Sequence, residues 1–180
     1  MRLVLFIVCF LSLSISLLAA DWALEIIPTG NGTAGQSIDT RNEAFVVLLT
    51  NTSDHDLSTW IEEFSWGYDN LSFLITRADG SSFSVVKKPE FFTVNEAVPY
   101  LVRPRGHFAW AVTFSPDEWT GFPANWKGYE EVTIQARFEI DPTSESKEMK
   151  VWTGKIESPP LKVSLTRFLK QWYLKRSYSD

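Results

Sequence analysis

The sequence predicts an all-β domain in which two antiparallel sheets pack face to face as a β-sandwich. Apolar and polar residues alternate with a period of two over much of the chain after residue 20, which places one face of each strand in a core. Turn signals rich in Gly, Asn and Asp divide these stretches into eight or nine short strands, and no internal segment has a convincing helical period. A small β-barrel is the alternative architecture.

Four strands are predicted in the first half of the chain, at residues 22–27, 45–49, 71–76 and 83–85. The second of these is a continuous apolar run, as expected of a central strand that is covered on both faces. The Gly-rich residues 30–35 predict a loop, and Asp79-Gly80 predicts a hairpin turn between the third and fourth strands.

The second half alternates more regularly. Phe108, Trp110, Val112 and Phe114 share one strand face, and residues 132–140 alternate strictly. The same period continues at Trp152 and Ile156 and over residues 161–165. The predicted β-domain therefore spans residues 21–165.

The first twenty residues predict export. Arg2 precedes an apolar run that ends in the small residues Ala19-Ala20, and Asp21 begins a polar segment. This is the pattern of a cleavable signal peptide, and Ser residues thin the apolar run below what a membrane anchor needs. An uncleaved signal anchor is the alternative. We expect the protein to be secreted or periplasmic.

Composition limits the classes of partner. Removing residues 1–20 takes one Arg from the 17 Lys and Arg and none of the 22 Asp and Glu, so the net charge changes from −5 to −6. An acidic chain argues against nucleic acid as a partner. Cys9, the one cysteine, lies in the predicted signal, so the mature domain has no disulfide and no cysteine metal site.

No motif in the sequence supports catalysis, a cofactor or a metal. A Ser-His-acid triad needs a histidine base, and the two histidines, His55 and His107, lie in a polar turn and at the start of a strand. Asp54-His55-Asp56 is the usual solvated arrangement of a turn. Glu62-Glu63 and Glu130-Glu131 are adjacent pairs whose members would point to opposite faces of a strand. A secreted hydrolase that uses carboxylates remains an alternative, because sequence spacing does not pair carboxylates across a cleft.

Two aromatic segments between strands are the candidate ligand-binding sites, because flat aromatic side chains stack on sugars and anchor protein interfaces. The long connection over residues 115–129 is the first, and the segment over residues 60–68 is the second. The candidate ligand-binding residues are Trp119, Phe122, Trp126, Tyr129, Trp60, Trp66 and Tyr68. The other interpretation is that these aromatics hold their own loops against the core, since Trp is normally largely buried.

The basic, aromatic segment over residues 166–180 ends the chain. Phe168, Leu169 and Trp172 fall at helical spacing among four Lys and Arg residues. Two interpretations stay open: a short C-terminal helix or tail that packs on its own domain, or an amphipathic helix that makes weak contact with a membrane surface or an acidic partner.

Three short motifs carry a resemblance to a known family. Asn51-Thr52-Ser53-Asp54, then Tyr68-Asp69, then Asp79-Gly80 resemble the strand and turn pattern of bacterial immunoglobulin-like domains, including the BsuPI-type intracellular proteinase inhibitors. The resemblance covers residues 43–114. It departs from the family at Pro104-Arg105-Gly106, where the family has adjacent Pro and Gly. The chain as far as Lys155 is also similar to exported bacterial immunoglobulin-like proteins of unassigned role.

These observations lead to one expectation about function. We expect an exported immunoglobulin-like β-sandwich that acts as a non-catalytic binding module and engages a protein or a polysaccharide through its aromatic loops. The ligand would lie in the cell envelope or the extracellular space. A protease inhibitor, which the resemblance implies, and a carboxylate hydrolase are the alternatives.

Overall fold

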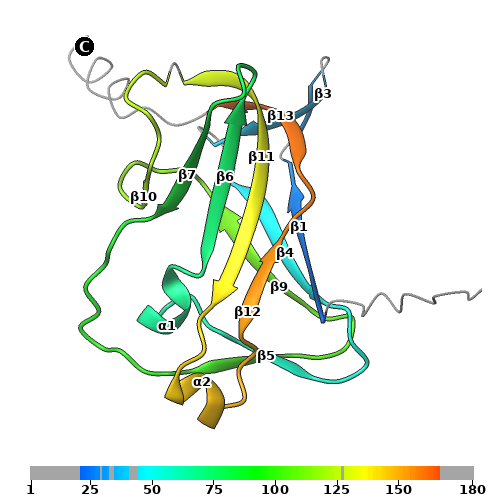
Figure 1. The fold of residues 1–180 in the computed structure, drawn as a ribbon, viewed down its shortest axis with the longest axis vertical. Coiled ribbons are helices and arrows are strands. Elements are labelled where there is room, and N and C mark those ends of the chain that lie inside the picture. Colours follow the sequence, from blue (N-terminus) through cyan, green and yellow to red (C-terminus); the bar gives the residue numbers. More distant parts are fainter. Residues whose placement is uncertain (1–20, 29, 33–34, 41–43, 127, 167–180) are drawn as a thin grey trace, which may run out of the picture.

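The computed structural model describes residues 21–28, 30–32, 35–40, 44–126 and 128–166, and these residues are mostly β, in largely antiparallel sheets (Figure 1). This arrangement is compatible with the predicted sandwich. The elements in chain order are β1 (Trp22–Ile27), β2 (Gly30–Gly32), β3 (Gly35–Asp39), β4 (Phe45–Asn51), β5 (Leu57–Trp60), α1 (Ser65–Tyr68), β6 (Leu71–Arg77), β7 (Ser82–Lys87), β8 (Pro99–Val102), β9 (His107–Val112), β10 (Trp119–Thr120), β11 (Tyr129–Ile140), α2 (Ser144–Glu148), β12 (Gly154–Glu157) and β13 (Leu161–Thr166).

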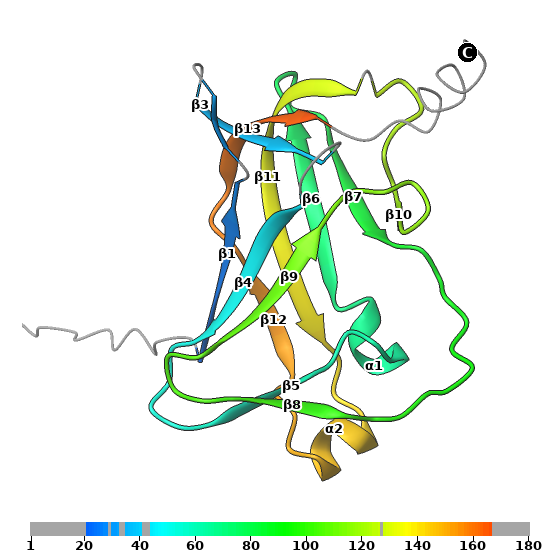
Figure 2. The ribbon, with the colours of Figure 1, turned by 180° about the vertical axis from the view of Figure 1, so that it is seen from behind.

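Strands β1, β4 and β9 form one layer, seen from its side of the molecule in Figure 2. Strand β4 lies in the middle and pairs antiparallel with both neighbours. Its alternate residues Phe45, Val47 and Leu49 are buried, whereas Val46 and Leu48 on the other face are only half-buried. The central position predicted from the apolar run is therefore confirmed, but the second face of this strand is not fully covered.

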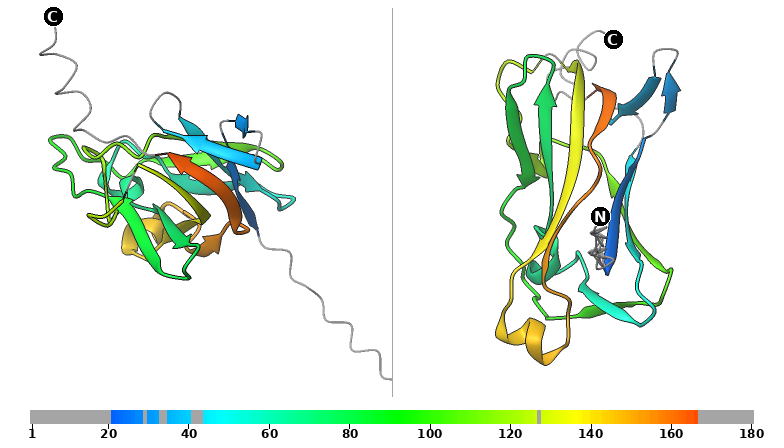
Figure 3. Two further views of the ribbon diagram at one scale, coloured as in Figure 1. Left: turned by 90° about the horizontal axis from the view of Figure 1, so that it is seen from above. Right: turned by 45° about the vertical axis from the view of Figure 1, so that its right-hand side comes forward.

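The second layer is a larger sheet with the strand order β10-β7-β6-β11-β13-β3-β2, and Figure 3 shows the two layers side by side. Strand β11 pairs with β6 along one edge and with β13 and then β12 along the other. Ser158, which lies between β12 and β13 in the chain, is hydrogen-bonded to β11: its N–H donates to Ala136 O at 2.9 Å, and its Oγ accepts from Ala136 N at 3.0 Å. Two prolines, Pro159 and Pro160, follow where β12 gives way to β13, as expected since proline offers no N–H to a strand ladder.

The core between the layers is built on aromatic side chains that meet edge to face. The ring centroids of Phe73 and Phe114 are 5.0 Å apart, and Phe45 lies 5.2 Å from Phe114. All three side chains are fully buried. Each such pair adds about 0.5–1.5 kcal/mol to the stabilisation that burial of its surface provides. The described residues contain no cysteine, so this packing stabilises the domain without disulfide bonds.

A buried asparagine forms the corner where β4 passes into β5. Asn51 is fully buried, and its Nδ2 donates to the carbonyl oxygens of His55 and Val102 at 2.8 and 2.9 Å. Its Oδ1 accepts from the N–H and the hydroxyl of Ser53 at 2.9 and 2.7 Å. Because every polar atom of this side chain is satisfied, the polar turn predicted at residues 51–54 is an ordered corner of the fold.

Several short segments differ from the sequence-based expectation, among them strands β5, β8 and β10, which were not predicted. The predicted loop over residues 30–35 contains β2 and the first residue of β3, which pair antiparallel, and β3 also pairs parallel with β13. Two one-turn helices, α1 and α2, lie where no helix was predicted. Helix α2 begins with a capping box between Thr143 and Ser146. The helix itself is too short to show a helical period in the sequence.

The described part of the chain extends the predicted β-domain to Thr166, the last residue of β13. None of the helices in that part is long and apolar enough to cross a membrane. The predicted signal peptide over residues 1–20 and almost all of the predicted tail over residues 166–180 lie outside the described residues.

Candidate functional site

The candidate site begins with a buried lysine at the end of β7. Alternation along this strand turns Phe83, Val85 and Lys87 toward the core, so a charged group occupies an inward position. Only 3% of the Lys87 side chain is exposed. Burying an ammonium group is unfavourable unless it is paired and hydrogen-bonded, so its partners define the local structure.

Two carboxylates and two aromatic rings enclose this ammonium group. Lys87 Nζ donates to Glu62 Oε1 at 2.8 Å and to a carboxylate oxygen of Glu118. It lies 5.0 Å from the ring centroid of Tyr68 and 4.8 Å from that of Trp119. The cation therefore has electrostatic partners on several sides, while Glu62 and Glu118 remain 34% and 40% exposed at the surface.

Tyr68 brings a third carboxylate to this cluster. Burial raises the pKa of Tyr68 to about 12, with further contributions from its hydrogen bond to Glu90 and from the negative charges of Glu90, Glu118 and Glu62. The phenol therefore stays protonated and donates to Glu90 over the ordinary pH range. We call this group the Lys87 cluster; its members are Lys87, Glu62, Glu90, Glu118, Tyr68 and Trp119.

The loop over residues 88–98, which joins β7 to β8, is attached at its first residue. Lys88 N donates to Glu118 O at 2.8 Å, and Lys88 Nζ donates to Pro116 O at 2.5 Å. The start of the loop is thus attached to the turn that precedes β10. Figures 1 and 2 show the loop running along the edge of the molecule outside α1.

The middle and the end of the same loop are also attached. Asn95 caps α1, because its Oδ1 accepts from Ser65 N at 3.0 Å and its Nδ2 donates to Ser65 Oγ at 2.8 Å. The ring of Phe92 packs edge-on against Tyr68 at 5.4 Å. At the end of the loop, Ile61 N donates to Val98 O at 3.3 Å. These contacts hold the loop on α1 and β5.

Phe91 and Val94 are the exposed apolar residues of this attached loop. They are 87% and 65% exposed, whereas the neighbouring Phe92 is half-buried. Burying a side chain of this size contributes about 1.5–3 kcal/mol, which this fold does not use at either position. We call Phe91 and Val94 the loop surface. Apolar surface on an ordered segment is available for burial against another molecule.

The structure places the aromatic residues of the connection over residues 115–129 largely in the core. Trp119 and Trp126 are 2% and 6% exposed, and half-buried Phe122 packs against Trp126 and Phe114 at 5.2 Å each. These contacts agree with the interpretation that the aromatic side chains hold their own connection against the core, and not with the interpretation that they bind a ligand. Their burial leaves no indole face for a ligand to stack on.

A close backbone approach explains this burial. Strand β10 in the connection pairs with β7, and Trp119 lies opposite Lys87. At Gly121, a Cβ atom would lie 2.0 Å from Ser84 O, so only glycine allows the connection to lie so close to β7. Strand β10 is thereby held on the edge of the core.

The remaining predicted residues fall in different places. Trp60 is 3% exposed and packs 6.5 Å from half-buried Trp66, so this pair also belongs mainly to the fold. Tyr68 belongs to the Lys87 cluster. Tyr129 is 57% exposed, and its hydroxyl donates to Glu131 at 2.9 Å on the outer face of the larger sheet. The predicted residues thus do not form one site.

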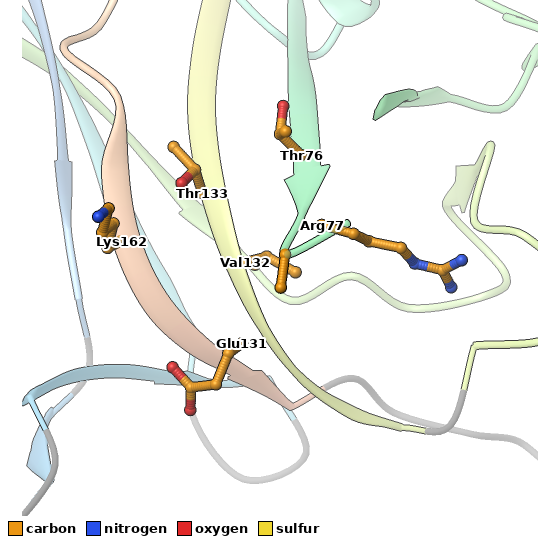
Figure 4. A pocket seen from close by; sticks show the side chains of 7 residues that line it. Thr76, Arg77, Glu131, Val132, Thr133 and Lys162 are labelled. Atoms are coloured by element: carbon orange, nitrogen blue, oxygen red, sulfur yellow. The ribbon is translucent and has the colours of Figure 1, made fainter. Parts of the chain in front are cut away.

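A shallow hollow of about 240 Å³, lined in part by Glu131, lies on that outer face (Figure 4). A hydrogen bond from Ser164, followed by the one from Tyr129, lowers the pKa of Glu131 below its usual value. Figure 4 shows Arg77 extending away from the hollow, and its Nε pairs with Glu130 at 2.9 Å. The lining residues are Thr76, Arg77, Ala78, Glu131, Val132, Thr133 and Lys162.

The structure also locates the residues considered for catalysis. His55 pairs with exposed Asp54 at 3.1 Å, and His107 shares a hydrogen bond with Thr50 at 2.8 Å. Glu130 and Glu131 bind different partners, Arg77 and Ser164. Among the described residues, no three His, Cys, Asp or Glu side chains gather as metal ligands.

The loop surface was missed in the sequence analysis, although a signal for it exists. Residues 88–98 form a long connection without strand alternation and with two adjacent phenylalanines, Phe91 and Phe92. The same reasoning that selected residues 115–129 applies to this segment. The predicted site residues are rich in tryptophan, which is concentrated in the segments that the structure buries.

Comparisons of the chain with protein-family models, with curated proteins and with solved structures give no match.

Proposed function

We propose that this chain is an exported, non-catalytic binding module with an immunoglobulin-like β-sandwich fold, and that it binds a protein partner through the loop surface. The observation that carries this proposal is the exposure of Phe91 and Val94, at 87% and 65%, on a loop attached at its start, middle and end. A partner that covers them gains apolar burial without having to order the loop.

The attachment of the loop supports a binding role in a second way. An exposed side chain on a loop that is already ordered loses little conformational freedom on binding, and aromatic anchors of this kind dominate the energy of many protein interfaces. Phe91 therefore has the properties of an anchor residue. A protease is one class of protein partner, in which case the module would act as an inhibitor.

A polysaccharide is the second candidate ligand, because one observation favours it. Tyr129 exposes an aromatic side chain whose hydroxyl donates to Glu131, a lining residue of the hollow over β6, β11 and β13. Sugar rings stack on such side chains and accept hydrogen bonds from the neighbouring polar groups. This surface belongs to the outer face of the larger sheet, so substitutions distinguish it from the loop surface.

The test is site-specific photo-crosslinking of the full chain in cells that export it. A photoreactive phenylalanine analogue replaces Phe91 or Val94 in two variants, Tyr129 in a third variant that tests the polysaccharide surface, and Val86 in a control. Val86 is the matched control, because it is an exposed apolar residue of β7, next to Lys87 but on the opposite strand face.

We expect a protein adduct of one defined mass from positions 91 and 94 and none from position 86. A glycan adduct from position 129 alone would favour the polysaccharide, and the absence of an adduct at both loop positions would contradict the proposal. Purified proteases with a preference for large apolar side chains, assayed with the full chain and with Phe91→Ala, would identify an inhibitor.

A further inference from the structure

The outer face of the layer formed by β1, β4 and β9 is apolar, whereas the outer face of an antiparallel sheet is normally polar. The larger sheet follows the normal pattern, because the outward residues of β11 after Tyr129 are all polar or charged. On β4 the outward residues are Val46, Leu48 and Thr50, all half-buried. Their neighbour Ile27 on β1 is 40% exposed. The apolar run of β4 predicted a strand covered on both faces, and this second face is not fully covered by the described residues.

The strand register arranges the outward residues of this layer in three rows that run from β1 through β4 to β9. The rows are Ala23, Thr50 and His107; Glu25, Leu48 and Ala109; and Ile27, Val46 and Ala111. The outward residues of β1 and β9, at the two edges of the layer, are all exposed. Each row has an alanine at one edge and a large side chain at the other. We call these nine residues the β4 face.

This distribution of large and small side chains makes the β4 face complementary to itself. Two packed sheets lie about 10 Å apart, and their facing side chains interdigitate. In a dimer whose two-fold axis runs along β4, β1 of each copy lies against β9 of the other. Each large edge residue then meets an alanine, as Ile27 meets Ala111 of the other copy. Val46 and Leu48 meet their own counterparts at the axis, where their apolar surface is buried.

The charges of the β4 face favour the same orientation. Its two ionisable residues are Glu25 and His107. A two-fold axis across the strands would place β1 against β1, with Glu25 directly opposite Glu25 of the other copy, and like charges that lose water together destabilise a complex. With the axis along β4, Glu25 faces Ala109 and lies one row from His107 of the other copy, a side chain that can carry the opposite charge.

We propose that the β4 face is the interface of a homodimer in which β1 of each copy packs against β9 of the other. A standard interface takes about 20–30 residues from each partner, and the β4 face is smaller, so the dimer is a weak one. The proposal does not rest on the protein-binding function, because the loop surface belongs to another part of the molecule.

The first measurement is sedimentation equilibrium of the full chain, purified from cells that export it, from about 1 µM to about 1 mM. Ala111→Glu places a carboxylate without a partner against Ile27 of the other copy. Ala124→Glu is the matched control, because Ala124 is an exposed alanine in the connection over residues 115–129. We expect the parent and Ala124→Glu to dimerise alike, and the Kd of Ala111→Glu to rise at least about tenfold. Circular dichroism verifies that each variant is folded.

The second measurement determines which strands meet, and it uses a short bismaleimide that joins two cysteines. Ile27→Cys is mixed with Ala111→Cys in one sample and with Ala23→Cys in another, and the parent is the control for Cys9. We expect a crosslinked dimer from the first mixture alone. A crosslink from the second mixture alone would show that the axis runs across the strands, and it would overturn the proposed arrangement.

Two results of the first measurement would overturn the inference. A parent that stays monomeric at about 1 mM would leave the β4 face to another occupant, such as residues 167–180 of the same chain. A folded Ala111→Glu variant that dimerises as strongly as the parent would place the interface elsewhere. Neither result bears on Phe91 and Val94, so the proposed function would stand or fall by its own test.

Discussion

The two aromatic connections on this edge of the molecule have opposite relations to the core. The connection over residues 115–129 buries Trp119 and Trp126, whereas the loop over residues 88–98 leaves Phe91 87% exposed. Both meet at the Lys87 cluster, since Trp119 comes from the first and Glu90 from the second. The difference therefore arises from how each backbone is attached to its neighbours.

The first connection pairs with β7 and lies so close to it that Gly121 has no room for a side chain. Its aromatics are thereby drawn into the core. The second is held by backbone hydrogen bonds at its two ends, and in its middle by Phe92 on Tyr68 and Asn95 on Ser65, and these contacts leave Phe91 and Val94 outside. Aromatic residues in a connection indicate a role in stability or in binding. Which of the two roles applies depends on how the backbone of the connection is held against its neighbours.

Truncation of Trp119 is the strongest test of this contrast. Trp119→Ala removes a 2%-exposed indole that packs against Phe73 and Phe114 at 5.4 and 5.7 Å. We expect a loss of about 3–5 kcal/mol in the free energy of unfolding, measured by urea denaturation. A loss below about 1 kcal/mol would mean that the connection does not depend on this side chain.

A glycine pair tests the close approach of the connection. Gly121 and Gly80 both have positive φ, at 103° and 84°, but a Cβ would be 2.0 Å from Ser84 O at Gly121 and would meet nothing within 4 Å at Gly80. Gly80→Ala should cost about 1–2 kcal/mol for its backbone conformation alone. Gly121→Ala should cost about 1–3 kcal/mol more, because the backbone must shift.

The same urea denaturation measures both glycine variants. Equal losses would show that backbone conformation, and not the approach to β7, explains the glycine at position 121.

The alkaline stability of the domain tests the Lys87 cluster, where the two connections meet. The pKa of Tyr68 is raised from 10 to about 12 in the folded protein. Between these values the unfolded chain loses the phenol proton first, so the contribution is complete below pH 10 and is lost as the pH rises toward 12. The difference is about 1 kcal/mol after allowance for solvent screening.

Urea midpoints at two pH values, one below and one within this window, should therefore fall less in Tyr68→Phe than in the parent. An identical fall in both proteins would place the Tyr68 phenol in water.

Two neighbouring phenylalanines give the smallest expected effect on stability. Phe91→Ala should change the free energy of unfolding by no more than about 0.5 kcal/mol, because the ring already lies in water. Phe92→Ala should cost about 1–2 kcal/mol, because half-buried Phe92 packs on Tyr68. Urea denaturation of both variants checks the pair, and a larger loss for Phe91 would mean that it stabilises the fold.

Local sequence patterns predicted much of the architecture. Strands β1, β6 and β11 match the alternation at residues 22–27, 71–76 and 132–140, because a period of two is a property of the extended chain itself. The pairing of β3 with β13 escaped prediction, because it joins residues more than a hundred positions apart. The one-turn helices escaped because they are too short to show a period.

The sequence by itself determined a β-rich domain, the positions of most strands and the importance of the aromatic connections. Only the tertiary structure decided that Trp119 is buried, that Phe91 is exposed, and that Lys87 lies between Glu62 and Glu118. The physical reason is that exposure depends on which distant segments cover a side chain. Alternation along one strand tells which of its residues share a face. The residues that cover that face come from another part of the chain, which the local pattern does not identify.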